Sequence, residues 1–257
     1  MKNYDSKLEK AIELYKNGMS LTKIQKEVGI ERHRLGREFK KLDINIVQNN
    51  KIHKINESIF EQIDTEEKAY WLGFLYADGY VSKTGIELAL KQSDYNHLVK
   101  FKKFLECDYD IKYHKSTNSY RICIHSKKIV NDLTNLGCMQ AKSLILQFPT
   151  EKQVPTHLIH HFMRGYFDGD GSICRTNFSV LGTKEFLIEY ESYILNYLQR
   201  NNPNKMLKKE NINIIQYGGR IQVLKIFQFL YENATIYLER KYDKFNALLP
   251  SQDEADK

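Results

Sequence analysis

The chain has 257 residues, 42% of them hydrophobic, which is enough for two or three packed units with sizeable cores. It has no apolar run of membrane length and does not begin with a signal peptide, so we expect a soluble, cytoplasmic protein with no membrane partner. The net charge of +7 indicates a polyanionic partner, although charge alone does not distinguish DNA, RNA and acidic lipid surfaces. The irregular cysteine spacing excludes a disulfide framework and a zinc site, and we expect core or half-buried thiols at Cys107, Cys123, Cys138 and Cys174.

Residues 1–42 carry most of the excess positive charge, with eleven Lys or Arg against six Asp or Glu. Their pattern predicts three short helices, the second starting after the N-cap Ser20 and the third, Glu31–Leu42, following a turn at Gly29. The third helix carries a basic cluster of Arg32, His33, Arg34 and Arg37. This arrangement resembles helix-turn-helix modules, whose last helix enters the DNA major groove. We predict a helix-turn-helix DNA-binding domain at residues 1–45; the alternative is a small helical bundle with a solvated basic face.

Residues 46–64 are polar and predict a linker, and helical structure should resume at Thr65. A short motif then occurs twice. The segment WLGFLYADGYV at residues 71–81 returns ninety-two positions later as FMRGYFDGDGSI at residues 162–173. Each copy predicts a short helix with a strip of small residues, at Gly73 and Ala77 and at Gly165 and Gly169, where a second backbone can approach closely. The Asp-Gly ending of each copy predicts a glycine in the left-handed cap conformation.

Each predicted helix ends in an acid, Asp78 in the first copy and Asp170 in the second. A carboxylate at the negative end of a helix is unfavourable, and so is a second carboxylate facing it, unless a cation lies between them. Carboxylate oxygens are ligands that Mg²⁺ prefers. The repeat therefore predicts that a divalent cation lies between the two acids.

Both copies resemble the motif of the LAGLIDADG (dodecapeptide, DOD-type) homing endonucleases, and the resemblance extends from about Thr65 to Leu249. A lysine follows each acid in turn, Lys142 in the first copy and Lys241 in the second. The resemblance implies an α+β fold of two pseudo-symmetric αββαββα halves with saddle-shaped antiparallel sheets. We place the halves at residues 65–150 and 151–250, followed by a polar tail at residues 251–257.

The resemblance also implies an active site that holds two or three Mg²⁺ ions, with Mn²⁺ as a substitute. Asp78 and Asp170 would bind metal together with the backbone carbonyls of Ala77 and Gly169, while Lys142 and Lys241 would orient water or offset phosphate charge. The first copy departs from the motif by having Tyr76 where the second has Asp168. We expect Asp168 to point away from the metal and to bind a backbone group or a basic side chain.

Predicted strands such as residues 120–126 alternate between apolar and polar side chains. In the LAGLIDADG family such sheets lie along the DNA major groove, which implies that their polar faces read bases here. Candidate contacts to bases or phosphates are Glu87, Lys112, Lys115, Arg121, His125, Asn211, Asn213 and Gln216. The alternative is an ordinary solvent-exposed sheet face.

These features together predict a sequence-specific double-strand DNA endonuclease of the homing type, encoded by a mobile genetic element and acting as a monomer on double-stranded DNA. Three alternatives stay open: a catalytically inactive transcription regulator on the same fold, an intron maturase that binds RNA, and a fragment of an intein. Both acids are retained, which argues against the regulator. The chain has neither a nucleophile at its start nor a His-Asn end, which argues against a whole intein.

Overall fold

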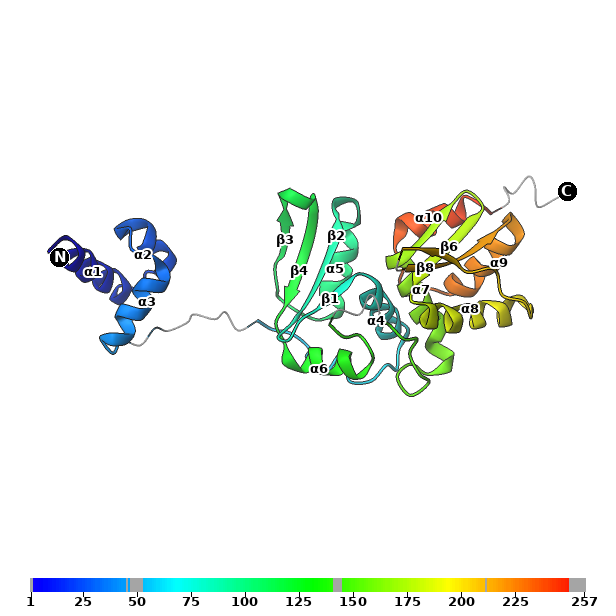
Figure 1. The fold of residues 1–257 in the computed structure, drawn as a ribbon, viewed down its shortest axis with the longest axis horizontal. Coiled ribbons are helices and arrows are strands. Elements are labelled where there is room, and N and C mark those ends of the chain that lie inside the picture. The colour runs from blue at the N-terminus through cyan, green and yellow to red at the C-terminus, as the bar shows by residue number, and fades with distance from the viewer. Residues whose placement is uncertain (1, 45, 47–52, 141–144, 211, 250–257) are drawn as a thin grey trace. The chain divides into compact units, whose positions relative to one another are not determined.

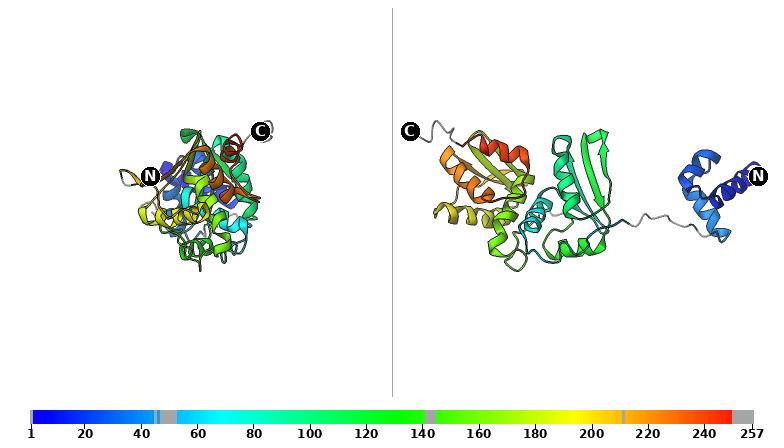
Figure 2. Two further views of the ribbon diagram at one scale, coloured as in Figure 1. Left: turned by 90° about the vertical axis from the view of Figure 1, so that its right-hand side faces the viewer. Right: turned by 180° about the vertical axis from the view of Figure 1, so that it is seen from behind.

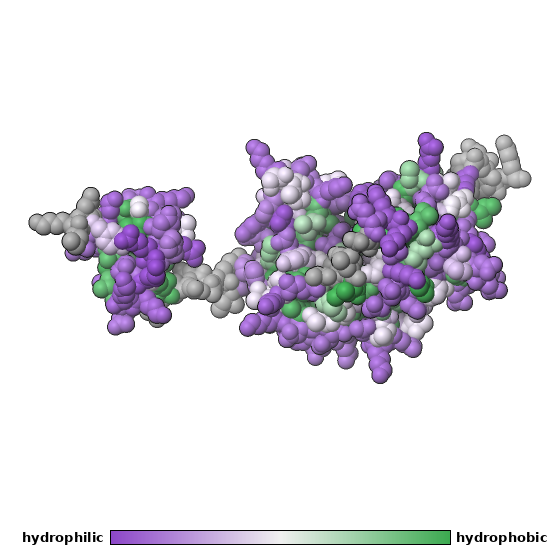
Figure 3. All heavy atoms as spheres, viewed as in Figure 1, coloured by the Kyte–Doolittle hydropathy of each residue, from purple (hydrophilic) through white to green (hydrophobic). Residues whose placement is uncertain are grey.

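The computed structural model describes residues 2–44, 46, 53–140, 145–210 and 212–249, with the backbone alone for Lys2 and Asn3. The chain divides into two compact units, Met1–Ile52 and His53–Lys257. No helix in these described ranges is both long enough and apolar enough to cross a membrane. The face drawn in Figure 3 is largely hydrophilic.

The first unit contains the three predicted helices, α1 (Lys2–Lys16), α2 (Leu21–Val28) and α3 (Arg32–Lys41) (Figure 1). Gly29 ends α2 with φ 71° in the left-handed region, where glycine is favoured because it has no Cβ. Ser20 is the N-cap residue, although its side chain makes no capping hydrogen bond. The helices enclose a small apolar core of Ala11, Ile24, Val28, Ile30, Leu35 and Phe39.

Only part of the expected linker at residues 46–64 lies outside the second unit, because that unit begins at His53. The amide of Asn56 donates a hydrogen bond to the carbonyl of Leu105 (3.1 Å). Phe60 is fully buried and packs edge-on against Phe104. The linker prediction was therefore wrong from His53 onward, because Phe60 and Ile63 are buried in the core of the second unit and anchor this segment.

The second unit repeats one order of elements, which confirms the α+β fold with two αββαββα halves. The first half contains α4 (Glu66–Asp78), β1 (Gly79–Val81), β2 (Ile86–Lys91), α5 (Tyr95–Phe104), β3 (Ile111–His114), β4 (Ser119–Ile124) and α6 (Lys127–Asn135). The second half contains α7 (Ile159–Asp170), β5 (Gly171–Cys174), β6 (Asn177–Gly182), α8 (Lys184–Leu198), β7 (Leu207–Lys209), β8 (Ile212–Gly218), α9 (Arg220–Tyr231) and α10 (Glu239–Asn246). Helix α10 has no counterpart among the described residues of the first half.

Each half has one antiparallel sheet of four strands, in the order β1-β2-β4-β3 and β5-β6-β8-β7. Residues paired across antiparallel strands point to the same face. The pair Leu88 and Ile122 is fully buried, as is the pair Val180 and Ile215. These pairs lie on the helix-covered face of each sheet, so the opposite face is the outer one. Helices α4 and α7 lie between the two sheets (Figures 1 and 2).

Helices α4 and α7 cross at the predicted strips of small residues. A Cβ added to Gly73 would lie 2.0 Å from the carbonyl oxygen of Phe162, and one added to Gly165 would lie 1.9 Å from that of Tyr70. A Cβ added to Gly169 would lie 2.3 Å from the Cβ of Ala77. All three distances are far below van der Waals contact, so the backbones meet only because these positions are glycine.

The prediction that a left-handed glycine ends each motif helix is wrong. Gly79 has φ −73° and Gly171 has φ −86°, and each residue begins a strand. Both positions still exclude a side chain. A Cβ added to Gly79 would lie 2.6 Å from the carbonyl oxygen of Leu75, and one added to Gly171 would lie 2.1 Å from the ring of Phe167. These glycines are required by the tight turn from helix to strand and not by a positive φ.

We predict that Gly73→Ala and Gly165→Ala each destabilise the second unit by about 3 kcal/mol or more, because an added methyl group would overlap a backbone carbonyl that cannot move alone. Urea unfolding followed by tryptophan fluorescence measures this, since the single Trp71 lies on α4. Gly36→Ala in α3 is the control, because its Cβ would meet only a side chain at 3.7 Å. Unchanged unfolding midpoints for both crossing variants would contradict this packing of α4 against α7.

Candidate active site

Asp78 and Asp170 are the last residues of α4 and α7, the two helices that cross. A Cβ added to Gly169 would lie 3.5 Å from Oδ2 of Asp78, so that carboxylate reaches across to the other helix. The charges of both acids influence the same two groups. Burial raises the pKa of Tyr166 and both acids raise it further, whereas burial lowers the pKa of Lys241 and both acids oppose that decrease. The two acids and the lysine therefore share one site.

Lys241 is 3% exposed and lies beneath the end of α7. Its Nζ donates hydrogen bonds to the carbonyls of Phe167 (2.5 Å) and Gly169 (3.2 Å). These carbonyls belong to the negative end of the helix, which a cation stabilises. Burial lowers the pKa of Lys241 to about 8, with Asp168 the strongest opposing influence. Lys241 thus supplies positive charge directly below the two acids.

The first half has different chemistry at the equivalent point. Lys142 lies outside the described residues. Leu75 occupies the place in α4 that Phe167 occupies in α7, and its carbonyl accepts a hydrogen bond from the thiol of Cys138 at 3.5 Å. Cys138 is buried, Cys107 and Cys123 are partly buried, and Cys174 is exposed, which corrects the expectation for Cys174.

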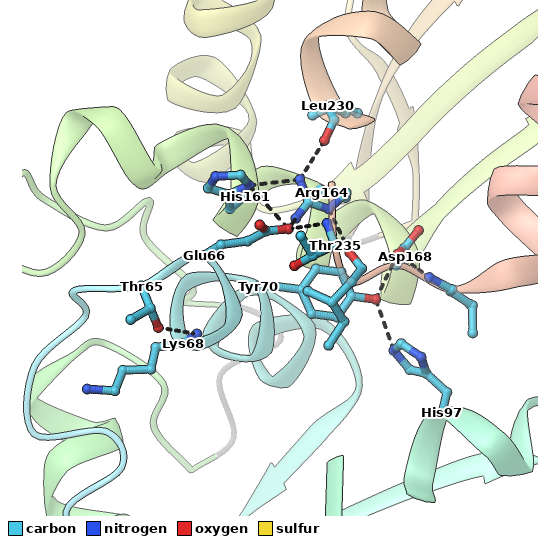
Figure 4. Close-up of polar contacts among 12 residues, drawn as sticks. Thr65, Glu66, Lys68, Tyr70, His97, His161, Arg164, Asp168, Leu230 and Thr235 are labelled. Carbon is cyan, nitrogen blue, oxygen red and sulfur yellow. Dashed lines mark hydrogen bonds and ion pairs between the residues drawn. The ribbon is translucent and has the colours of Figure 1, made fainter. Parts of the chain in front are cut away.

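Asp168 is fully buried and points into a polar network (Figure 4). It accepts hydrogen bonds from the hydroxyl groups of Tyr70 (2.7 Å) and Tyr231 (2.5 Å) and from the amide of Leu238 (2.7 Å). Burial raises the pKa of Asp168, while Lys241 and the three donors oppose the increase. The backbone contact agrees with the sequence-based expectation, but the two tyrosines were not anticipated. Leu238 immediately precedes α10, so Asp168 fixes the start of the helix that carries Lys241.

Tyr76, at the position equivalent to Asp168, has a simpler polar environment. Its hydroxyl donates to the carbonyl of Leu136. Burial raises its pKa, so it stays protonated. The two halves therefore differ at this position: an acid connects several elements in one, and a phenol satisfies one carbonyl in the other.

His97 on α5 extends the network into the first half (Figure 4). Its Nε2 lies 2.9 Å from the Tyr70 hydroxyl, which already donates its proton to Asp168. The imidazole must therefore donate from Nε2, so it is the neutral tautomer protonated there. Its Nδ1 has no hydrogen-bond partner among the described residues. Burial lowers the pKa of His97 to about 3, and Lys100 and Arg240 contribute to the shift.

A buried ion pair also joins the halves, between Arg164 of α7 and Glu66 of α4. The fully buried Arg164 donates from Nη2 to Glu66 (2.6 Å) and from its other nitrogens to the carbonyls of Leu230 (2.8 Å) and Ile236 (3.0 Å) (Figure 4). Burial, which raises the pKa of Glu66, is outweighed by the amide of Thr235 and by Arg164, so this pKa lies below its usual value. An arginine within the motif helix, between Met163 and Gly165, was the one sequence signal for this pair.

Helix α10 is bound from the first half as well. Arg240 Nε donates to both carboxylate oxygens of the buried Asp94, at 3.1 and 2.8 Å. Glu239 pairs with Lys100 of α5. Lys241 therefore directly follows two residues whose partners belong to the other half of the unit.

On the outer face of the first sheet, the predicted base readers contact each other. Arg121 donates from Nη1 to Glu87 (3.0 Å), which also accepts from the thiol of Cys123 (3.2 Å). Burial raises the pKa of Cys123 to about 11. Lys112 pairs with Arg121 across the strands on the same face. Two exposed candidates lie at strand ends, Lys115 after β3 and His125 after β4.

The three candidates in the second sheet differ in position. Gln216 is exposed on the outer face. Asn213 alternates with the buried Ile215 and Tyr217, so it lies on the helix-covered side, because successive strand residues point to opposite faces. Grouping Asn213 with Gln216 as a base reader was therefore wrong. Asn211 lies outside the described residues.

In the first unit, the four basic candidates on α3 are all exposed: Arg32, His33, Arg34 and Arg37. The guanidinium of Arg34 lies 4.3 Å from the ring centre of Tyr4. The backbone amide of Arg32 donates to Gln25 (2.9 Å). The basic face is thus available, and one of its arginines is stacked on an aromatic ring of α1.

We predict that acid destabilises the protein through His97. Its folded pKa of about 3 lies below the value of 6.5 for a free imidazole, so below pH 6.5 the unfolded chain binds the additional proton. This contribution to stability is complete above the unfolded pKa and declines as the pH falls towards the folded one, by about 2 kcal/mol near pH 5. Urea unfolding from about pH 7 to about pH 5 should show a shallower pH dependence for His97→Gln than for the parent. Parallel curves would contradict the neutral, buried imidazole.

No protein-family model and no curated protein matches the sequence. Among solved structures, 84 chains are similar. The meganuclease I-SmaMI bound to uncleavable DNA is 11% identical, with a TM-score of 0.51 over 74% of this chain and 93% of that one. A point mutant of I-SmaMI is 14% identical, with a TM-score of 0.50 over 72% and 92%. The N-terminal LAGLIDADG domain of DUF199/WhiA is 15% identical, with a TM-score of 0.44 over 72% and 92%. Over 72 to 74% of its length, this chain therefore has the fold of the single-chain, two-domain LAGLIDADG homing endonucleases.

Proposed function

We propose that the protein is a metal-dependent, sequence-specific double-strand DNA endonuclease of the homing type. The observation that carries this proposal is the convergence of Asp78 and Asp170 at the ends of two crossing helices, above the buried Lys241. One acid from each half suits a duplex, which presents one scissile phosphodiester on each strand. The retained acids favour this function over that of a regulator on the same fold, and no observation favours an RNA-binding maturase.

The oxygen donors at the site fit Mg²⁺. The carboxylates of Asp78 and Asp170 and the backbone carbonyls of Ala77 and Gly169 are hard ligands of the type that Mg²⁺ binds. Within the described part of the chain, no group of three or more His, Cys, Asp or Glu side chains could hold a metal ion. A site with only two carboxylates suits Mg²⁺, because this ion usually keeps several water ligands and shares phosphate oxygens. A divalent ion bound there would supply Lewis acidity and a more acidic water; Mn²⁺ accepts the same oxygen ligands.

The protein side chains around the acids have separate tasks in this proposal. Lys241 offsets negative charge that accumulates on the phosphate during hydrolysis, and its burial strengthens that interaction. Asp168 positions Lys241 through Leu238 and does not contact substrate. In the first half, Tyr76 and Cys138 satisfy backbone carbonyls. Lys142 remains the proposed basic group there.

DNA binding is assigned to two surfaces. The outer faces of the two sheets would follow the major groove on either side of the cleavage site, and the basic face of α3 would add contacts outside it. Because both acids come from one chain, we propose that the enzyme acts as a monomer. Its two similar halves would bind a site of corresponding pseudo-symmetry.

We predict that Asp78→Asn and Asp170→Asn each reduce double-strand cleavage by more than about a hundredfold, because each removes a charged oxygen ligand from the site. DNA binding should be retained or become slightly tighter, since a charge that repels phosphate is removed. Cleavage of a plasmid library with Mg²⁺ and filter binding at several salt concentrations measure the two effects. Asp243→Asn, an exposed acid on α10, is the charge-matched control.

If either variant cuts both strands at the parental rate, the site assignment is wrong. If the parent binds specific DNA and never cuts it with Mg²⁺ or Mn²⁺, the function of a regulator on the same fold becomes the better interpretation. Product ends identify the cleaved phosphodiesters and test for short 3′ overhangs, which the family resemblance implies.

We predict that removal of residues 1–42 weakens DNA binding and lowers the slope of log affinity against log salt by about 3, as expected when about three phosphates are no longer bound. Cleavage at saturating protein should continue at the same phosphodiesters, because Asp78, Asp170 and Lys241 belong to the other unit. Footprinting should show a shorter protected region on one flank.

A triple substitution of Arg32, Arg34 and Arg37 by alanine should reproduce most of this effect. The matched control removes three exposed lysines of α1, Lys7, Lys10 and Lys16, and so changes the net charge equally. An equal effect of the two triple variants would indicate a general charge effect. An unchanged slope and footprint after truncation would exclude α3 as a reading helix.

A further inference from the structure

The two sheets differ in chemistry at equivalent positions of their outer faces. Gly79 pairs with Leu88 in the first half, and Gly171 pairs with Val180 in the second, which fixes the correspondence of the strands. The row one step further along the first sheet consists of Ala89, Arg121 and Lys112. The corresponding row of the second sheet consists of Leu181, Ile214 and Leu207. Two cationic side chains in one half are thus matched by two aliphatic ones in the other.

The aliphatic row is on the surface and not in the core. Leu207 is 44% exposed, and Ile212, the next residue of β8 on the same face, is 41% exposed. Leu181 and Ile214 are partly buried. Their neighbours Val180 and Ile215 on the opposite face are fully buried beneath helices, so the core of this half is already complete without the row.

Positive charge borders the aliphatic row, because β7 continues from Leu207 into the exposed Lys208 and Lys209. Lys209 pairs with Ile212 on the outer face. A partner for this surface must combine apolar groups with negative charge close by. The major groove of duplex DNA has both, since thymine presents its C5 methyl group between the phosphate backbones.

We propose that Leu181, Leu207, Ile212 and Ile214 contact thymine methyl groups, so that the second half selects a thymine-rich half-site. The first half, with Arg121 and Lys112 on the equivalent row, selects guanine through hydrogen bonds to its acceptor edge. Glu87 supports this by holding the Arg121 guanidinium on the outer face. The target is therefore asymmetric in composition although the protein scaffold is pseudo-symmetric. This inference rests on the proposed function, which makes the sheets the DNA-reading surface.

Substitution of thymine by deoxyuridine tests the inference, because it removes only the methyl group. The preferred target is first selected from a randomised duplex library, and duplexes are then made with uracil in one half-site or the other. Uracil in the half-site of the second half should weaken parental binding by about fourfold for each buried methyl group that is removed. Uracil in the other half-site should leave affinity unchanged.

A double variant, Leu207→Ser with Ile214→Ser, should prefer thymine over uracil targets less than the parental protein does, because two of the four methyl contacts are removed. Ile221→Ser is the control, since Ile221 is 76% exposed on α9, away from the sheet. It should keep the parental preference for thymine. Equal affinity of the parental protein for thymine and uracil targets would overturn the inference while leaving the proposed function intact, whatever the variants do. Failure to select any specific duplex would overturn both.

Discussion

The close crossing of α4 and α7 is the constraint on which the rest of the second unit depends. Because Gly73 and Gly165 let the two backbones touch, the helices end side by side and bring Asp78 and Asp170 together. The same crossing concentrates negative potential, since two helix ends and two carboxylates meet at one place. Lys241 offsets part of this potential from below, and the oxygen-rich upper side suits a divalent cation. The helix crossing thus determines both the packing of the two helices and the position of the two acids.

The polar groups between the halves show how such a crossing is fixed in register. Arg164 and Asp168 are fully buried on α7, and each has hydrogen-bond partners from more than one element. A buried charge without partners would be costly, so these contacts favour one relative placement of α4, α7, α9 and α10. The strips of small residues allow α4 and α7 to come into contact, while Arg164 and Asp168 determine how the two helices are aligned.

Much of the second unit could be predicted from sequence because its signals are local or repeated. The duplicated motif located Gly73, Gly165, Asp78 and Asp170, and strand periodicity located the sheets. The contacts of Tyr70 and Tyr231 with Asp168, and of His97 with Tyr70, could not be predicted, because the partners lie far apart in sequence and no periodic pattern marks them. Asn213 was assigned to the wrong face because its residue type was considered without its position in the alternation of side chains along β8. The role of Gly79 was misjudged because absence of a side chain, and not backbone conformation, is what the turn requires.

The partners of the buried α7 side chains make the two halves non-equivalent. Tyr70 and Glu66 on α4 correspond in the repeat to Phe162 on α7 and to Leu158 just before it, which have neither a hydroxyl nor a carboxylate. Two copies of the second half placed together would leave Asp168 without the Tyr70 hydroxyl and Arg164 without its counter-ion. The second half could therefore not pair with a copy of itself through the same contacts, and each half supplies groups that the other one lacks.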